Sequence, residues 1–169
     1  MGPISPRDYL NEANSSETTA KRLDSLARAE WEFVRAAVAA NPKTDPQTLV
    51  KLVPAGIRLL DESIAVAIAR RVDAPAEALR ALARRFNAIS DWSGRSAGVD
   101  LGLALLSNPS TPNDAIVELL APARSTPHFR ARVATTTRLA SVLTLLRQDI
   151  SEKVRKRAER ALERLRAGE

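Results

Sequence analysis

Cysteine is absent from this chain of 169 residues, and histidine occurs once. Without thiols the chain cannot form a disulfide, a thiolate metal site, an iron–sulfur cluster or a cysteine nucleophile. A single histidine excludes a multi-histidine metal site within one chain. The 6 glycines are scattered, so there is no glycine-rich loop to cradle a phosphate group. We therefore expect no bound metal and no cofactor.

Aromatic residues make up only 4% of the chain, and long apolar runs are missing. The core must therefore be built from Ala, Leu, Val and Ile. No run approaches the ~18 apolar residues of a membrane span, and residues 1–6 lack the apolar core of a signal peptide. At ~100–200 residues per domain, the length predicts one domain. We expect a cytoplasmic protein with no membrane partner.

The formal net charge of +6 is unevenly distributed along the chain. Residues 1–120 hold 14 Lys and Arg against 15 Asp and Glu, a net charge of −1. Residues 121–169 hold 12 against 5, a net charge of +7. A basic segment of this kind is typical of a docking surface for an acidic partner, or of a solvated face that keeps a protein soluble.

Two segments nearly superimpose, which indicates an internal repeat. Residues 34–53 read VRAAVAANPKTDPQTLVKLV and residues 101–120 read LGLALLSNPSTPNDAIVELL, with Asn-Pro and a threonine at the same places. Residues 64–83 form a third copy, and residues 15–27 and 129–146 form fainter ones. The marker positions of the copies, 26, 30, 37 and 27 residues apart, are Leu23, Leu49, Leu79, Ile116 and Leu143.

Each copy has the same internal order. A short helix with small apolar residues at i, i+3 and i+4 comes first, and Asn-Pro ends it because the residue before proline avoids the α region. Thr44 is then placed to cap a second short helix, with Gln47 completing a capping box, and Thr111 with Pro112 stands at the same place in the later copy. No segment alternates at period two, so no strand is predicted. Stacking several such units buries a continuous core, which predicts an α-solenoid.

The copies also differ from one another. Arg71-Val72 and Thr136-Thr137 stand where two copies would have Asn-Pro. The interval of 37 residues indicates an insertion at about residues 85–99. Inserted loops of repeat arrays often form binding sites, and the insertion in this chain contains Trp92. The structural alternative is that Phe86 or Trp92 fills a gap between units.

Residues 29–53 carry a further pattern, whose turn recurs in residues 107–112. Its members are Trp31, Val34-Arg35, Ala37-Val38-Ala39, Asn41-Pro42, Thr44, Leu49 and Leu52. This pattern resembles a unit of the leucine-rich repeat variant (LRV) family. The resemblance implies a right-handed superhelix of alternating α and 3₁₀ or short α helices, similar in spirit to HEAT and armadillo arrays. It implies a binding surface and no single activity. The cysteine cluster of some relatives has no counterpart here.

The predicted fold is all-α: a right-handed α-solenoid of about four to five short helical repeats, capped by a longer C-terminal helix. Residues 1–14 are expected to be a flexible N-terminal segment or a cover for the edge of the array. Residues 15–167 are expected to form a single helical-repeat domain, with the insertion at about 85–99 and a basic part over 121–169.

The C-terminal helix is predicted over residues 149–167. Asp149 and Glu152 are placed to form its capping box, Ile150 begins its apolar stripe, and Glu159 is placed to pair with Arg155. Its many basic residues fit either a polar cap of the array or a surface for nucleic-acid backbone, with little base stacking because aromatics are scarce there. The candidate binding surface consists of Trp92, Arg95, Arg130, Arg132, Arg138, Lys153, Arg155, Lys156, Arg157, Arg160 and Arg164.

Two patterns raise catalysis as an alternative. Residues 94–98 match G-x-S-x-G, but that motif works above a parallel sheet, and no sheet is predicted. The only base for Ser96 would be His128, in a predicted loop. Asp91 beside Trp92 is an acid–aromatic pair of the kind a helical-repeat DNA glycosylase could use, yet two residues do not make such a site.

We therefore predict a non-enzymatic helical-repeat scaffold that mediates protein–protein interaction, with another protein as its partner. The alternative function is nucleic-acid (DNA) backbone binding through the basic C-terminal repeats. The sequence leaves the oligomeric state open.

Overall fold

The computed structural model describes residues 5–55, 61–87 and 97–168, and within these ranges the chain forms eleven α-helices and no strand. The all-α expectation is confirmed. The helices are α1 (Pro6–Asn14), α2 (Ala20–Leu26), α3 (Glu32–Ala40), α4 (Pro46–Leu52), α5 (Glu62–Arg70), α6 (Ala76–Asn87), α7 (Ala97–Ser107), α8 (Asn113–Leu120), α9 (Pro127–Thr136), α10 (Ala140–Leu146) and α11 (Glu152–Ala167). Among them, none combines the length and apolar character that crossing a bilayer requires.

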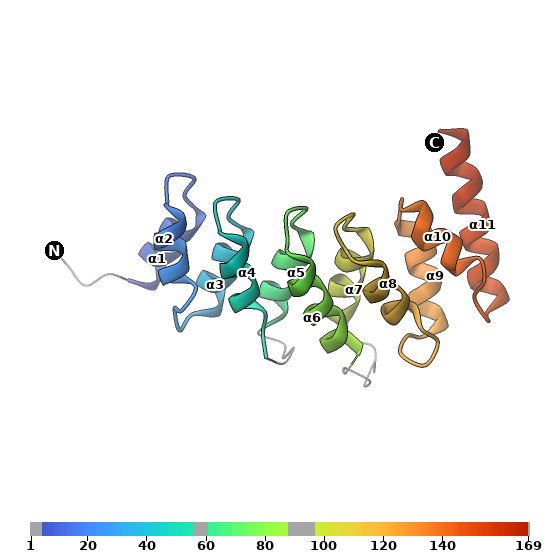
Figure 1. Cartoon of the computed structure of the whole chain (residues 1–169), viewed down its shortest axis with the longest axis horizontal. Coiled ribbons are helices and arrows are strands. Elements are labelled where there is room, and N and C mark those ends of the chain that lie inside the picture. Colours follow the sequence, from blue (N-terminus) through green and yellow to red (C-terminus); the bar gives the residue numbers. More distant parts are fainter. Residues whose placement is uncertain (1–4, 56–60, 88–96, 169) are drawn as a thin grey trace.

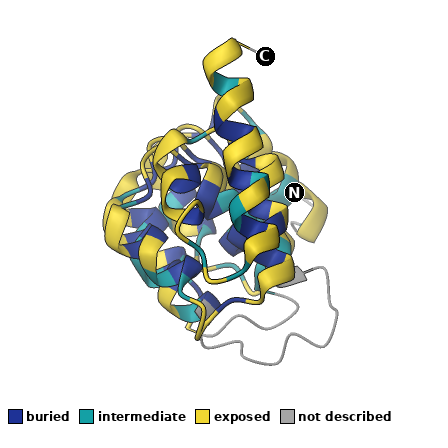
Figure 2. Ribbon diagram, turned by 90° about the vertical axis from the view of Figure 1, so that its right-hand side faces the viewer, coloured by how far each residue is buried: buried dark blue, intermediate teal, exposed yellow. Residues whose placement is uncertain are grey.

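The helices follow one another in pairs along the long axis of the molecule, with α1 at one end and α11 at the other (Figure 1). In the odd-numbered series α1 packs on α3, α3 on α5 and α5 on α7. In the even-numbered series α6 packs on α8. At the C-terminal end α11 packs on both α9 and α10. Seen along the axis, buried residues occupy the interior and exposed residues cover the outside (Figure 2).

The core is aliphatic, as the scarcity of aromatic residues requires. The first helix of a pair contributes small apolar residues at i and i+4, such as Val34 and Val38 in α3. The second helix contributes two larger residues at i and i+3, because that spacing places both on one helix face. All members of this second set are buried: Leu23, Leu26, Leu49, Leu52, Leu79, Leu82, Ile116, Leu119, Leu143 and Leu146.

The threonine after the first helix has a different role from the predicted one. The Thr44 hydroxyl donates to the carbonyl oxygen of Val38 and so closes α3. The residue that caps α4 is Asp45, whose side chain accepts from the Gln47 amide at 2.9 Å. The predicted Thr44–Gln47 capping box is therefore wrong. Because Pro46 takes the first helical position, the capping position falls on Asp45 and leaves Thr44 free to satisfy a C-terminal carbonyl.

The residue that directly follows α3, α5, α7 or α9 ties that helix to the preceding pair. Asn41 donates through Nδ2 to the carbonyl oxygens of Ala13 and Ser15, at 2.8 and 3.0 Å. Asn108 donates in the same way to Ala69 and Arg71, at 2.8 and 2.7 Å. These bonds satisfy carbonyls left open at the end of the preceding helix.

The copies without Asn-Pro keep this tie with other donors. The Arg71 guanidinium donates to the carbonyl oxygens of Asn41 and Pro42, and Thr137 donates to Leu106 at 3.2 Å. Asparagine, arginine and threonine therefore serve the same purpose at this position, since each offers a donor to a buried carbonyl.

Residues 6–14, expected to belong to a flexible segment, form α1 instead. Ser5 and Asp8 make a capping box, with the Ser5 amide donating to Asp8 at 2.8 Å. The Tyr9 ring stacks on Trp31 with 5.4 Å between centroids, and Ala13 is fully buried. Local capping and packing on α3 therefore order this segment.

Most of the predicted insertion, including Trp92 and Arg95, lies outside the described residues; its edges end α6 and begin α7. Phe86 is buried, and its ring lies 5.5 Å from that of Phe129. Both rings lie against Gly102, where an added Cβ would come within 2.7 Å of Phe129 and 3.0 Å of Phe86. The structural interpretation of Phe86 as a gap-filling residue is confirmed.

Candidate functional site

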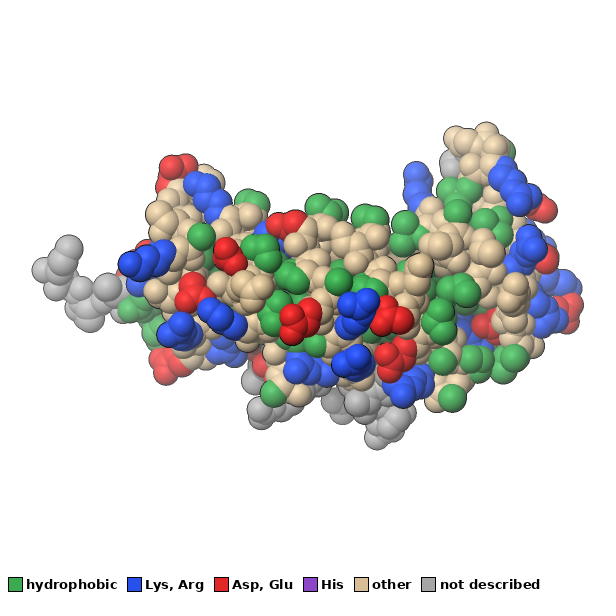
Figure 3. Space-filling view, viewed as in Figure 1, with side chains coloured by type: hydrophobic (Ala, Val, Ile, Leu, Met, Phe, Trp, Pro, Cys, Tyr) green, Lys and Arg blue, Asp and Glu red, His purple; other side chains and the backbone are tan. Residues whose placement is uncertain are grey.

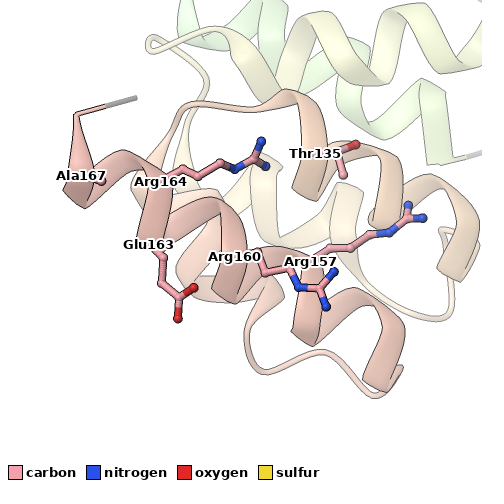
Figure 4. Close-up of a pocket in the computed structure, with 6 residues that line it drawn as sticks. All are labelled: Thr135, Arg157, Arg160, Glu163, Arg164 and Ala167. Carbon is pink, nitrogen blue, oxygen red and sulfur yellow. The ribbon is translucent and has the colours of Figure 1, made fainter.

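Two adjoining hollows open between α9 and α11, with volumes of about 780 and 350 Å³. We call them together the arginine hollow. The first is lined by Thr135, Arg157, Arg160, Glu163, Arg164 and Ala167 (Figure 4). The second is lined by Thr135, Thr136, Thr137, Arg138, Ala161, Arg164 and Leu165. Thr135 and Arg164 line both, so the two hollows form one surface.

One wall of this surface is a row of arginines on α11. Arg157, Arg160 and Arg164 are three and four residues apart, which places them on one side of the helix. At ~1.5 Å of rise per residue the row is about 10 Å long. Arg164 points toward Thr135 of α9 across the hollow (Figure 4). Arg138, just after α9, brings a positive charge from the opposite wall.

The charge of this wall is scarcely neutralised. Arg138, Arg160 and Arg164 are exposed and form no ion pair with another described residue. Arg157 reaches only the carbonyl oxygen of Ala131, at 3.4 Å. Glu163, the one acid of the lining, points away from the Arg164 guanidinium (Figure 4). Closely spaced positive charges around a concave surface raise the local positive potential, which favours an anion there.

The structure places Arg130, a predicted surface residue, in the interior. Its side chain is 1% exposed and forms a fork with Asp149, which is 4% exposed. Nε lies 2.5 Å from one carboxylate oxygen and Nη2 lies 3.1 Å from the other. Arg130 also donates to the carbonyl oxygen of Ser125. Arg130 is therefore a tie between α9 and the turn before α11, not a binding residue.

The predicted capping box of α11, formed by Asp149 and Glu152, is wrong because the Asp149 carboxylate already has other partners. Asp149 is occupied by Arg130 and by the amide of Ser151, which donates to it at 2.8 Å. The helix begins at Glu152 with Ser151 as the capping residue and without a side-chain bond. Glu152 instead pairs with Lys156 at 2.7 Å.

Other predicted residues of the basic part do not reach the hollow. Arg155 donates to the carbonyl oxygens of Asp149 and Ile150, at 2.7 and 3.1 Å, rather than pairing with Glu159. Lys153, Lys156 and Arg132 are exposed but do not line it. Of the eleven predicted surface residues, the structure brings together Arg138, Arg157, Arg160 and Arg164.

Among the residues that the structure describes, no catalytic arrangement of the kind the alternatives require is found. Asp91, Trp92 and Ser96 lie outside the described residues, and so does Arg95. His128 is exposed in the first turn of α9, not in a loop. Within the described ranges, no three acidic or histidine side chains gather as metal ligands would.

A separate hollow of about 330 Å³, which is not part of the arginine hollow, lies between α8, α10 and the turn before α11. We call it the apolar hollow. Its lining residues are Val117, Leu120, Ala121, Pro122, Leu145, Leu146, Gln148, Asp149 and Ile150. Val117, Leu145 and Ile150 are 54%, 41% and 74% exposed. Hydrophobic side chains reach the surface near this end of the molecule (Figure 3).

Sequence reasoning missed the apolar hollow. The sequence pattern predicts Ile150 in the apolar stripe of the C-terminal helix, but Ile150 precedes that helix and is exposed. Val117 directly follows the core residue Ile116, and Leu145 directly precedes the core residue Leu146. The only available signal in the sequence was therefore an extra apolar residue next to each core position.

Comparison of the chain with protein-family models, with curated proteins and with solved structures finds no match. The two hollows are therefore interpreted from their own residues.

Proposed function

We propose that this protein is a non-enzymatic helical-repeat scaffold that binds another protein through the apolar hollow. The proposed architecture is a right-handed α-solenoid of the kind the LRV resemblance implies. One observation carries the functional proposal: Val117, Leu145 and Ile150 expose apolar surface around a single concavity.

The proposed occupant is a short apolar segment of a different protein. Burying exposed aliphatic surface contributes about 25 cal/mol per Å², and binding energy tends to concentrate where an anchor side chain fills a desolvated pocket. The hollow, at about 330 Å³, lies at the lower end of the ~300–1,000 Å³ of ligand pockets and is open to solvent. It therefore suits a few side chains of a partner.

Charge favours a different protein over a second copy of this chain. Most residues that line the apolar hollow belong to the basic part, residues 121–169, which carries a net charge of +7. Two copies meeting there would bring two positive ends together, and that repulsion weakens association. A neutral or acidic partner avoids this cost.

The proposal is tested with a displayed peptide library selected on the purified protein, followed by affinity measurements on the enriched peptides. Peptides with aliphatic anchors are expected to lose affinity about tenfold or more in the V117S/I150S variant, since two desolvated contacts disappear. V72S, which changes a similarly exposed valine away from this hollow, is the control. The proposal is wrong if no peptide binds V72S more tightly than V117S/I150S. It is also wrong if the only effect of V117S/I150S is a loss of self-association, measured by analytical ultracentrifugation.

A further inference from the structure

We infer that the arginine hollow binds the phosphodiester backbone of duplex DNA. This site lies on a different surface from the apolar hollow and adds a second binding activity to the proposed scaffold. The juxtaposition that supports it is the row Arg157, Arg160 and Arg164 on α11 along the larger hollow, with Arg138 added in the smaller hollow, which it lines together with Arg164.

The spacing of the charges suits a polyanion. Each strand of a DNA duplex is a dense line of negative charge, with one phosphate per about 3.4 Å of axis, so an arginine row of about 10 Å can contact more than one phosphate of a strand. A guanidinium can donate two parallel hydrogen bonds to one phosphate, which makes arginine suited to this role. Further Lys and Arg side chains, interspersed with Asp and Glu, lie at the α11 end of the molecule (Figure 3).

The lining favours nucleic acid over an acidic protein. The cores of protein interfaces are depleted in charged residues and depend on apolar or aromatic anchors. The larger hollow offers three arginines, one glutamate, a threonine and an alanine, so it has no pocket for an apolar anchor. Phosphate backbone needs none, because counterion release supplies most of its non-specific binding energy.

The lining also favours a duplex over a single strand. Single-strand binders stack successive bases on aromatic side chains, which supplies much of their affinity. No aromatic residue lines either part of the arginine hollow. Phe129, the nearest candidate by sequence, is buried against Phe86. Binding is therefore expected to be independent of base sequence, since phosphate contacts carry no direct sequence information.

The test is the affinity of the full chain for a random DNA duplex of about 20 base pairs, measured by fluorescence anisotropy between about 50 and 200 mM NaCl. The variant R138Q/R160Q/R164Q removes three charges from both walls, at exposed positions with no ion pair to a described residue. K21Q/K43Q/R84Q removes the same charge from exposed positions in the rest of the chain.

The wild-type protein is expected to bind with an affinity that falls steeply with salt. In R138Q/R160Q/R164Q the log–log salt slope should shrink by about 0.9 for each lost phosphate contact, and the affinity at low salt should fall about tenfold or more. K21Q/K43Q/R84Q should stay within about threefold of wild type. V117S/I150S should bind DNA as the wild type does, which separates this inference from the proposed scaffold function.

Three results would overturn the inference. The first is DNA binding that is undetectable or insensitive to salt. The second is an equal loss in the two triple variants, which would assign the binding to net charge. The third is displacement of the duplex by polyglutamate at equal charge concentration, which would indicate an acidic protein as the ligand.

Discussion

The buried ion pair between Arg130 and Asp149 gives the sharpest prediction about stability. The change is Asp149→Asn, which keeps the size of the side chain but removes its charge. The guanidinium of Arg130 would then stay buried without a counter-ion, since its side chain is 1% exposed. Breaking a buried pair from one side typically costs about 3–5 kcal/mol, because the remaining charge has lost its solvation and its partner.

The chain offers a matched control near its other end. Arg22 makes a similar fork with Glu12, at 2.7 and 2.8 Å, but these side chains are 42% and 36% exposed. Glu12→Gln should therefore cost at most about 1 kcal/mol, because water and salt compensate the exposed arginine. The two variants change the same chemistry and differ mainly in burial.

Thermal unfolding, followed by circular dichroism, measures the difference. At ~2–4 °C per kcal/mol for a chain of this size, Asp149→Asn should lower the Tm by about 6–20 °C, and Glu12→Gln by no more than about 4 °C. Hydrogen exchange should show the loss of protection concentrated in α9 and in α10 and α11 on either side of Asp149, because Arg130 ties α9 to the turn between them. Equal effects of the two variants would refute the reasoning that burial decides the cost.

Three further predictions concern single side chains. Gly102→Ala should destabilise the protein by about 1–3 kcal/mol in denaturant unfolding, although alanine is the better helix former, because the new Cβ would lie 2.7 Å from Phe129; a gain in stability would contradict this packing. Asn108→Asp should lower the Tm more than Asn108→Ala. Both variants lose the Nδ2 donor, but the aspartate carboxylate would also face the two carbonyl oxygens that now accept from Nδ2. The opposite order would show that the donor is dispensable. The pKa of Glu62 is raised above its ordinary value of 4.5, first by burial and then by the charge of Asp100. The folded state therefore favours the protonated form of Glu62. The stability that this protonated carboxyl contributes is lost as the pH rises above about 4.5 and the carboxyl ionises. Glu62→Gln should thus raise the Tm slightly at about pH 7 and lose that advantage near pH 4; an advantage that does not change with pH would rule out this ionisation.

The helical character could be predicted from the sequence because it depends on local rules. Asn41-Pro42 ends α3 as expected, and the i, i+3 leucines of the second helices are all buried. Where the prediction went wrong, a neighbouring residue competed for the same role. Asp45 rather than Thr44 caps α4, since Pro46 moved the capping position by one residue.

The candidate surface was harder to predict because charge alone does not report burial. Arg130, Arg155 and Arg160 are the same residue type in the same basic part. Arg130 is buried against a carboxylate, Arg155 holds the turn before α11, and Arg160 lines the arginine hollow. The sequence offered basic residues on several sides of α11, and only the position of α9 showed that Arg157, Arg160 and Arg164 adjoin a concavity.

The sequence by itself determined the all-helical character, the aliphatic character of the core and the concentration of positive charge in the last 49 residues. These properties depend on composition and on spacings of a few residues, which local physics converts into structure. The tertiary structure alone decided which arginines are buried, which face a hollow, and where Ile150 and Val117 become exposed. Those outcomes depend on contacts between segments far apart in the chain, such as Arg130 with Asp149, and no local pattern encodes them.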